Sequence, residues 1–298
     1  MRKRAARQLR SFAERTGIGV VNTFMGKGVI PRGDPHCLFT MGLQTRDHVT
    51  CLMEEADVVI AVGYDLVEYH PRFWNKGRRK QVIHIDFEPA EVDADYNPQV
   101  EIVADIADSL WTVNEALGER EPLFDASRHS AYRETMLAEL AAYAEDAASG
   151  AIKPQKALWD ARQALGPEDI LLSDVGAHKM WIGRYYPCDE PNTCLISNGF
   201  CSMGFAFPGA MAAKLVHPDR RVLAICGDGG FLMNIQDLET AVRLGLNVVV
   251  LVWEDGGYGL IEWKQDTQFQ RHSELAFGNP DWVKLAEAFG AWGARVER

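Results

Sequence analysis

Short, continuous apolar runs alternate with helix-length segments along most of this chain. Four runs fall in the first half of the sequence: GVVNTF, DVVIAVG, QVIHIDF and VEIVAD. Four more fall in the second half: DILLSD, TCLIS, RVLAICGD and NVVVLVWED. Uninterrupted apolar runs of this length are typical of parallel strands covered on both faces. The pattern predicts an α/β protein with two doubly wound domains, each built on a parallel sheet.

The stretch between the two series divides the chain. From Ala107 to Gly150 the composition turns to Ala, Glu and Arg, with helical spacing and little β propensity. We therefore expect a first domain at 1–125, a helical connector at 126–150 and a second domain at 151–298. One helix alone precedes the first strand, and the chain stops at AWGARVER where a new strand should begin. Both domains are accordingly expected to be truncated.

Charge and apolar content exclude several kinds of partner. The 298 residues carry 42 acidic and 31 basic side chains, a net charge of -11, which argues against binding nucleic acid or an anionic membrane. The basic start MRKRAARQLR is expected to be the exposed face of one helix, given the apolar spacing through Leu9 and Phe12. No apolar stretch approaches the roughly 20 residues that span a bilayer, so we expect a cytoplasmic protein. The six cysteines include no CxxC pair, so neither a zinc site nor a disulfide framework is expected.

Two aspartates flank one strand-helix-strand unit, ICGDGGFLMNIQDLETAVRLGLNVVVLVWEDGGYG. Asp228 and Asp255 follow consecutive strands, which returns both to the carboxyl edge of the sheet, where ligands bind. Glycines beside Asp228 allow backbone N–H groups to approach an anion. A carboxylate would repel a phosphate there unless a cation lay between them, so the pattern predicts Mg²⁺ bridging Asp228 and a diphosphate.

A plainer interpretation is that GDGG is only a turn and Asp255 only a helix cap. GDG alone would favour that interpretation. The combination of GDGG, the spacing to Asp255 and DGGYG favours the metal site. No GxGxxG follows the strand, which excludes a dinucleotide fingerprint in this segment.

The same stretch resembles the cofactor and metal motif of thiamine diphosphate enzymes, in which GDG is followed about two dozen residues later by Asn-Asn or a close relative. Four further segments are similar to acetolactate synthase large subunits, above all the catabolic type that works without flavin: VGYDLVEYHPRFWN, SDVGAHKMWIGRYY, ISNGFCSMGFAFPGA and FGNPDWVKLAEAFG. The resemblance covers nearly the whole chain. It implies thiamine diphosphate and Mg²⁺ as cofactors, pyruvate as substrate, and a homo-oligomer, dimer or tetramer, because the cofactor lies between subunits.

The resemblance also assigns the metal and diphosphate contacts. Asp228 and Asp255 would ligate Mg²⁺ through their side chains and Gly257 through its carbonyl; many family members have Asn in place of Asp255. His178 would contact the diphosphate at a helix N-terminus, although a solvent-facing cap histidine is an equal alternative. Gly229 and Gly230 would offer their backbone N–H groups to the diphosphate. Gly227 and Tyr258 are also expected at the cofactor.

The reacting end of the cofactor would meet a second group of residues. The carbonyl of Cys201 would accept from the aminopyrimidine, and Met203 would hold the cofactor bent, which makes proton removal intramolecular. Leu260 and Ile261 would wall the thiazolium and acceptor pocket. For Met203, Leu260 and Ile261, plain core packing is the alternative. Lys264 stands where catabolic members have glutamine, which leaves the acceptor preference open.

The implied reaction joins two pyruvates to 2-acetolactate with loss of CO₂, with thiamine diphosphate as the electron sink. GYDLVEYHPRFWN favours a structural first domain, so FAD is not expected. Nothing in the chain matches the pyrimidine-binding domain that supplies a glutamate in this family, so we expect a fragment that is inactive alone. Three alternatives stay open: another 2-oxo acid decarboxylase or carboligase, a non-catalytic cofactor-binding module completed by a partner chain, and an unrelated Mg²⁺-dependent phosphate-binding protein.

Overall fold

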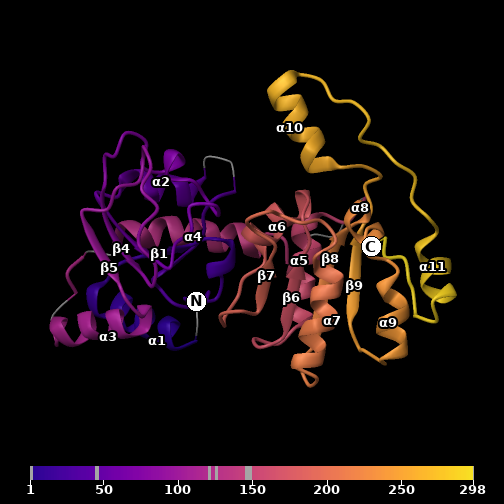
Figure 1. Ribbon diagram of the computed structural model, residues 1–298, viewed down its shortest axis with the longest axis horizontal. Coiled ribbons are helices and arrows are strands. Elements are labelled where there is room, and N and C mark those ends of the chain that lie inside the picture. Colours follow the sequence, from indigo (N-terminus) through magenta and orange to yellow (C-terminus); the bar gives the residue numbers. More distant parts are fainter. Residues whose placement is uncertain (1–2, 44–46, 120–121, 125–126, 145–149, 298) are drawn as a thin grey trace. The chain divides into compact units, whose positions relative to one another are not determined.

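The computed structural model describes residues 3–43, 47–119, 122–124, 127–144 and 150–297 (Figure 1). The chain forms two compact units: residues 1–141 with 187–192, and residues 142–186 with 193–298. Every strand pair in the sheets of both units is parallel. The predicted α/β class with parallel sheets is therefore confirmed, and the predicted domain bounds stay a prediction.

The first unit contains a two-stranded sheet, β1-β2, and a three-stranded sheet, β3-β4-β5. Its strands are β1 (Val20–Asn22), β2 (Cys37–Thr40), β3 (Val58–Val62), β4 (Gln81–Asp86) and β5 (Val100–Val103). Its helices are α1 (Lys3–Thr16), α2 (His48–Glu55), α3 (Ile106–Leu117) and α4 (Ser127–Ala141), with two short 3₁₀ turns, η1 (Phe24–Gly26) and η2 (Pro71–Phe73). The stretch that was expected to be helical thus holds α3 and α4.

Helices α1 and α3 pack against each other over an apolar core. Leu9, Phe12 and Leu110 are buried in it, so the apolar spacing of the basic N-terminal segment marks an inward face. One basic side chain of that segment also turns inward: Arg10 Nε donates to the Val29 carbonyl over 2.7 Å. The expectation of a purely exposed basic face is corrected in that respect.

The second unit has one four-stranded sheet in the order β7-β6-β8-β9. Its strands are β6 (Ile170–Ser173), β7 (Cys194–Ile196), β8 (Val222–Gly227) and β9 (Val249–Trp253). Its helices are α5 (Pro154–Ala164), α6 (Ala177–Tyr185), α7 (Ala206–Val216), α8 (Asp228–Leu232), α9 (Asp237–Arg243), α10 (Gly259–Phe269) and α11 (Trp282–Ala288). The chain runs from β6 outward to β7 and then crosses back to β8. The crevice at the carboxyl ends of β6 and β8 is therefore the switch point where parallel sheets bind ligands.

The core of the second unit lies between β6, β8 and α7. Leu172, Ala224 and Phe207 are almost fully buried there. Helix α7 approaches the sheet closely because it carries Gly209, where a Cβ would come within 2.8 Å of Leu172 Cδ2. This packing holds the carboxyl ends of β6 and β8 in place.

The elements not predicted from the sequence include β2, α2, α11 and the short α8, which begins at Asp228 itself. The expectation that all strands are covered on both faces is also wrong for the edge strands, since Val100 on β5 is 48% exposed and Val249 on β9 is 59% exposed. An edge strand lacks a neighbour on one side, whereas the continuous apolar run reports only composition. Among the helices of the described residues, none is both long and apolar enough to cross a membrane.

Candidate functional site

Two carboxylates meet at the carboxyl ends of β8 and β9. Gly227 pairs with Trp253 in the sheet, so the next residues leave the two strands side by side. The Asp228 carboxylate is 1% exposed, and its Oδ2 accepts hydrogen bonds from the backbone N–H groups of Asp255 (3.1 Å) and Gly256 (2.7 Å). The sheet thus buries one acidic group and holds a second one next to it.

The environment of Asp255 raises its pKa. Partial burial and then the neighbouring Asp228 carboxylate raise the pKa of Asp255, against the lowering effect of the Gly257 amide. Two carboxylates held this close repel each other unless a cation or a proton lies between them. A hard divalent cation with oxygen ligands is the group that this donor set fits.

His178 lies in the same crevice, near the start of α6. It is 5% exposed, hydrogen-bonds to the Asp174 backbone and contacts the Trp253 ring edge-on, with 6.2 Å between ring centroids. Burial lowers the pKa of His178 to about 4, so the imidazole is neutral near pH 7. The solvent-facing alternative is therefore wrong. In the described part of the chain, its Nε2 atom is buried without a hydrogen-bond partner, which leaves a polar atom for a bound ligand.

The glycines of the GDGG segment are surrounded by the protein's own side chains. A Cβ on Gly229 would lie 2.8 Å from Tyr258 Cε1, and one on Gly230 would lie 2.7 Å from Asp174 Oδ2. The Gly229 N–H donates to Asp228 Oδ1 over 2.8 Å. Close packing of neighbouring residues is thus a sufficient reason for glycine at both positions, and the Gly229 amide is already engaged by Asp228.

The segment expected at the aminopyrimidine is a tight turn. Cys201 has a φ of 50°, a left-handed conformation that is uncommon for a residue other than glycine. Lys179 Nζ lies 3.4 Å from Cys201 Sγ and 2.9 Å from the Ser197 carbonyl, which it also binds. Such an outlier persists only where its surroundings hold it. Met203, in the same turn, is half-buried, so it is not a fully enclosed core residue.

Two further side chains fasten the end of this turn at Gly204. Asp174, at the end of β6, accepts from the Gly204 N–H over 3.0 Å, and Asn234 donates to the Gly204 carbonyl over 2.6 Å. Asp174 is fully buried, and burial raises its pKa although three backbone N–H groups, including that of Phe205, oppose this. Asp174 therefore links the turn at 201–204 to the carboxyl edge of the sheet.

Helix α10 carries the residues expected to wall the acceptor pocket. It contributes no buried residue and extends away from the sheet (Figure 1). Leu260 is half-buried and Ile261 is 44% exposed, so the core-packing alternative is wrong for Ile261. The assignment of both residues to the acceptor pocket stays a prediction.

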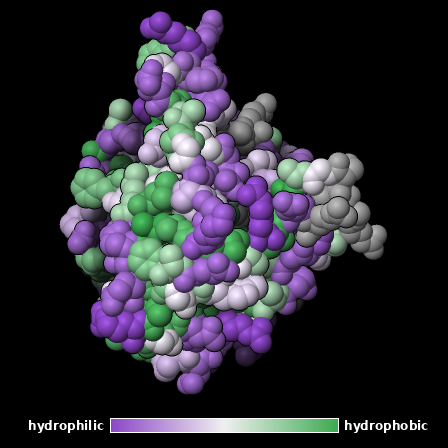
Figure 2. Space-filling view, turned by 90° about the vertical axis from the view of Figure 1, so that its right-hand side faces the viewer, coloured by the Kyte–Doolittle hydropathy of each residue, from purple (hydrophilic) through white to green (hydrophobic). Residues whose placement is uncertain are grey.

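Exposed apolar side chains also occur on α9, on β9 and after α11. Val242, Val249 and Trp292 are among them, the last being 88% exposed. One face of the molecule accordingly shows apolar side chains gathered beneath a hydrophilic projection (Figure 2).

Four residues at the site were not singled out from the sequence: Asp174, Lys179, Asn234 and Asn279. The signal for Asp174 was present, because it ends a buried strand in the same way as Asp228. Lys179 lies on α6, and Asn234 and Asn279 lie in loops; the spacing of these three in the sequence carries no such signal. Asn279, for example, lies 51 residues after Asp228 and donates to its Oδ2 over 2.7 Å.

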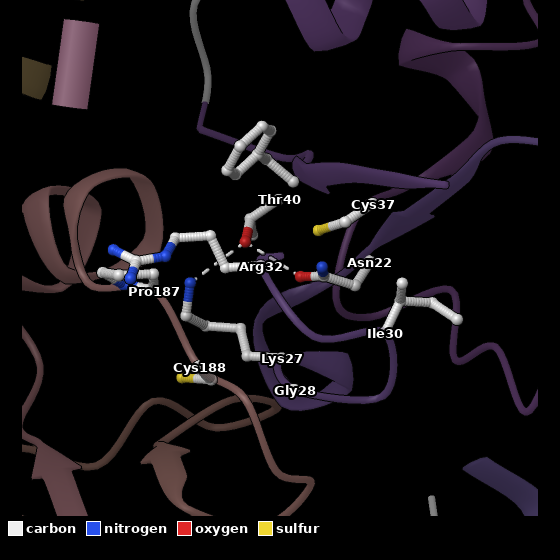
Figure 3. A pocket seen from close by; sticks show the side chains of 10 residues that line it. Asn22, Lys27, Gly28, Ile30, Arg32, Cys37, Thr40, Pro187 and Cys188 are labelled. Atoms are coloured by element: carbon white, nitrogen blue, oxygen red, sulfur yellow. Dashed lines mark hydrogen bonds between the residues drawn. The ribbon is translucent and has the colours of Figure 1, made fainter. Parts of the chain in front are cut away.

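The first unit contains a different polar cluster, around a small cavity (Figure 3). Lys27 Nζ donates to Thr40 Oγ1 over 3.2 Å, and Thr40 donates to Asn22 Oδ1 over 2.8 Å. Arg32 also lines the cavity, which has a volume of about 20 Å³. That is room for about one water molecule.

Comparison with known proteins identifies both parts of the chain. Residues 1–113 match the central domain of thiamine pyrophosphate enzymes, and residues 174–298 match their C-terminal TPP binding domain. The chain is 35% identical to an acetolactate synthase of Bacillus subtilis over 99% of its own length and 52% of the relative. It is 36% identical to a catabolic acetolactate synthase of Raoultella terrigena over 83% of its length and 44% of the relative.

A third relative, an acetolactate synthase large subunit of Haemophilus influenzae, is 31% identical over 97% of the chain and 51% of the relative. The chain thus spans about half the length of the curated relatives that it matches. With both domain matches in sequence order and the acidic pair at the carboxyl edge of the second sheet, the chain belongs to the thiamine pyrophosphate enzymes and carries their central and C-terminal cofactor-binding domains.

Proposed function

We propose that this chain is the central and C-terminal part of an acetolactate synthase, which condenses two pyruvates to 2-acetolactate with release of CO₂. The observation that carries the proposal is the Asp228–Asp255 pair at the carboxyl edge of the sheet, in a chain whose relatives are named acetolactate synthases. Thiamine diphosphate, when bound, supplies an electron sink for cleavage and formation of the carbon-carbon bond next to a carbonyl.

The chain's own residues would bind and orient that cofactor. Asp228 and Asp255 would hold Mg²⁺, with the Gly257 carbonyl as a third ligand, and the cation would neutralise the diphosphate. His178 would direct its buried Nε2 to the diphosphate as a neutral hydrogen-bonding group. The pair carries one more negative charge than an Asp-Asn pair would, so we expect firm cation binding and a strict need for the cation before an anion can enter.

The turn at 201–204 would position the aminopyrimidine. Asp174 and Asn234 hold Gly204, and Lys179 holds Cys201, so the Cys201 carbonyl is presented in a fixed direction. Met203 would then support the bent cofactor, with Leu260 and Ile261 toward the acceptor. Preorganisation of this kind is what makes an intramolecular proton transfer effective.

The proposal also covers the activity of the chain alone, its oligomeric state and the absence of FAD. Without the pyrimidine-binding domain of the family, the chain is expected to bind Mg²⁺ and thiamine diphosphate but to form no product alone. We further propose a homo-oligomeric cytoplasmic enzyme without FAD, in which the first unit has a structural role.

Product analysis tests the proposal. The chain is co-expressed with the N-terminal half of the Bacillus subtilis relative, and pyruvate, Mg²⁺ and thiamine diphosphate are supplied. We expect 2-acetolactate, and none when Asp228→Ala replaces the parent chain. Acetaldehyde as the sole product would favour a decarboxylase instead, and acetolactate from the chain alone would refute the need for the missing domain.

A further inference from the structure

Asn279 reaches the acidic pair because the segment before it runs beside the DGG turn. The Tyr258 N–H donates to the Leu275 carbonyl over 3.1 Å, and the Phe277 N–H donates to the Gly256 carbonyl over 3.0 Å. These bonds form an antiparallel bridge between Gly257 and Ala276. The bridge fixes the backbone two residues before Asn279 and so determines where its side chain lies.

The hydrogen bonds to Asp228 crowd one of its two oxygens, Oδ2. A carboxylate offers about four lone-pair positions. Gly229 N–H occupies Oδ1, and Oδ2 accepts from the N–H groups of Asp255 and Gly256 and from Asn279 Nδ2. Oδ1 thus keeps one lone-pair position, whereas Oδ2 carries more donors than its two positions hold, so a cation can bind Oδ2 only if one donor leaves. Three of the four donors belong to backbone held by the strand ends and the DGG turn, so the Asn279 amide is the donor that can move.

The oxygen of the same amide indicates how the Asn279 side chain can move. Asn279 Oδ1 is buried and has no hydrogen-bond partner among the described residues. A buried carbonyl without a partner is unfavourable. The last torsion of an asparagine side chain is soft and roughly two-fold, so half a turn exchanges Nδ2 and Oδ1. That half-turn removes the donor from Asp228 and offers an oxygen, the ligand type that Mg²⁺ prefers.

We propose that Asn279 is a cation-responsive residue of this site: its Nδ2 holds Asp228 while the cation is absent, and its Oδ1 faces the cation once Mg²⁺ is bound. The amide thereby binds Asp228 in the cation-free state and the cation in the loaded state, and so contributes to cation affinity. This inference rests on the proposed cation site at Asp228 and Asp255. No proton or electron is transferred in the exchange.

The test measures cation binding rather than catalysis. The whole chain is titrated with MgCl₂ in the presence of inorganic diphosphate, by calorimetry and by thermal melting. Asn279→Leu keeps the volume and removes both polar atoms, and we expect Mg²⁺ to bind about tenfold more weakly. Asn279→Asp keeps an oxygen ligand but adds a third carboxylate. We expect it to melt at a lower temperature than the parent without Mg²⁺, and to gain more from Mg²⁺ than the parent does.

A spectroscopic readout separates the exchange from a merely structural role. In ¹⁵N-labelled protein the two Nδ2–H resonances of Asn279, assigned by their loss in Asn279→Asp, should shift on addition of Mg²⁺ and diphosphate. Resonances that stay in place, or a Mg²⁺ affinity of Asn279→Leu within twofold of the parent, would overturn the proposal.

Asn114 provides a matched control in the first unit. Its Nδ2 donates to the Gln8 carbonyl over 3.0 Å, and its Oδ1 is likewise buried without a partner among the described residues. Asn114→Leu should leave Mg²⁺ binding unchanged; a loss equal to that of Asn279→Leu would count against a specific role. If the parent chain shows no saturable Mg²⁺ binding, the proposed cation site is refuted. If the parent and Asn279→Leu bind Mg²⁺ equally well, only the proposed role of Asn279 is refuted.

Discussion

The two units surround selected buried charges in different ways: lysines in the first unit and aspartates at the sheet edge of the second. In the first unit Lys27 is bound by Thr40, and Lys80 Nζ donates to the carbonyls of Glu54 (3.0 Å) and Ala56 (2.6 Å). In the second unit Asp174 and Asp228 are buried at the carboxyl edge of the sheet. The neighbouring His178 Nε2 and Asn279 Oδ1 have no partner in the part of the chain that the structure describes.

This difference separates a structural polar cluster from a binding site. Buried lysines whose ammonium groups meet hydroxyl and carbonyl oxygens need no ligand. Neighbouring carboxylates repel each other, and the buried polar atoms beside them lack hydrogen-bond partners within the described ranges. A bound cation would neutralise the carboxylates, and the cation and its anion would supply the missing partners. The contrast predicts that changes in the second unit alter the response to Mg²⁺, whereas changes in the first unit alter stability only.

The largest effect is expected from Asp228→Asn. The new amide would place N–H groups against the donors that now bind Oδ2, so the second unit should lose about 3 kcal/mol of unfolding free energy. The stabilisation by Mg²⁺ with diphosphate should also disappear. Urea unfolding with and without these ions measures both, with the exposed Asp219→Asn as the control. A parent-like response to Mg²⁺ in Asp228→Asn would abolish the contrast between the units.

A smaller effect is expected from Gly229→Ala. Its Cβ would meet the rings of Tyr258 at 2.8 Å and Phe277 at 3.0 Å, which hold the DGG turn and the following segment. Overpacking of this kind lowers stability by about 1–3 kcal/mol. Gly278→Ala is the matched control, because a Cβ there meets nothing within 4 Å. Equal melting temperatures of the two variants would show that the rings move aside freely.

Lys27→Met tests the first unit. The substitution replaces the buried ammonium by an apolar side chain of similar length, and its acceptor Thr40 keeps its own hydrogen bond to Asn22. We expect a change of about 1 kcal/mol or less in unfolding free energy and no change in Mg²⁺ affinity. Loss of Mg²⁺ binding in Lys27→Met would show that the first unit also serves the cation site.

The smallest effect concerns an exposed acidic cluster on and after α10. Glu262, Asp266 and His272 lie together, and the hydrogen bond from His272 Nδ1 to Asp266 (2.8 Å) raises the pKa of His272 above its ordinary value of 6.5. Protonation of His272 therefore favours the folded state; this contribution is full below pH 6.5 and is lost as the pH rises through the raised pKa. Asp266→Asn should return the pKa toward 6.5, as an NMR titration of the imidazole would show. An unchanged midpoint would mean that the pair does not form in solution.

Much of the fold follows from local patterns in the sequence. The apolar runs placed β3, β4, β6, β8 and β9 within one or two residues, because a buried parallel strand leaves an uninterrupted apolar signature. The strand β2 and the helix α2 were missed. CLFT is four residues long, and α2 starts at an Asp47 cap that has no strong apolar period behind it.

The sequence by itself determined that Asp228 and Asp255 leave neighbouring strands at one edge, since the period of a strand-helix-strand unit returns the chain to the same side of the sheet. Only the tertiary structure decided that Asp174 and Asn279 lie beside them, that His178 is buried, and that Ile261 is exposed. These residues reach their places through the strand order β7-β6-β8-β9 and through the bridge between Gly257 and Ala276. Such contacts join residues far apart along the chain, so they depend on packing and leave no periodic trace in the sequence.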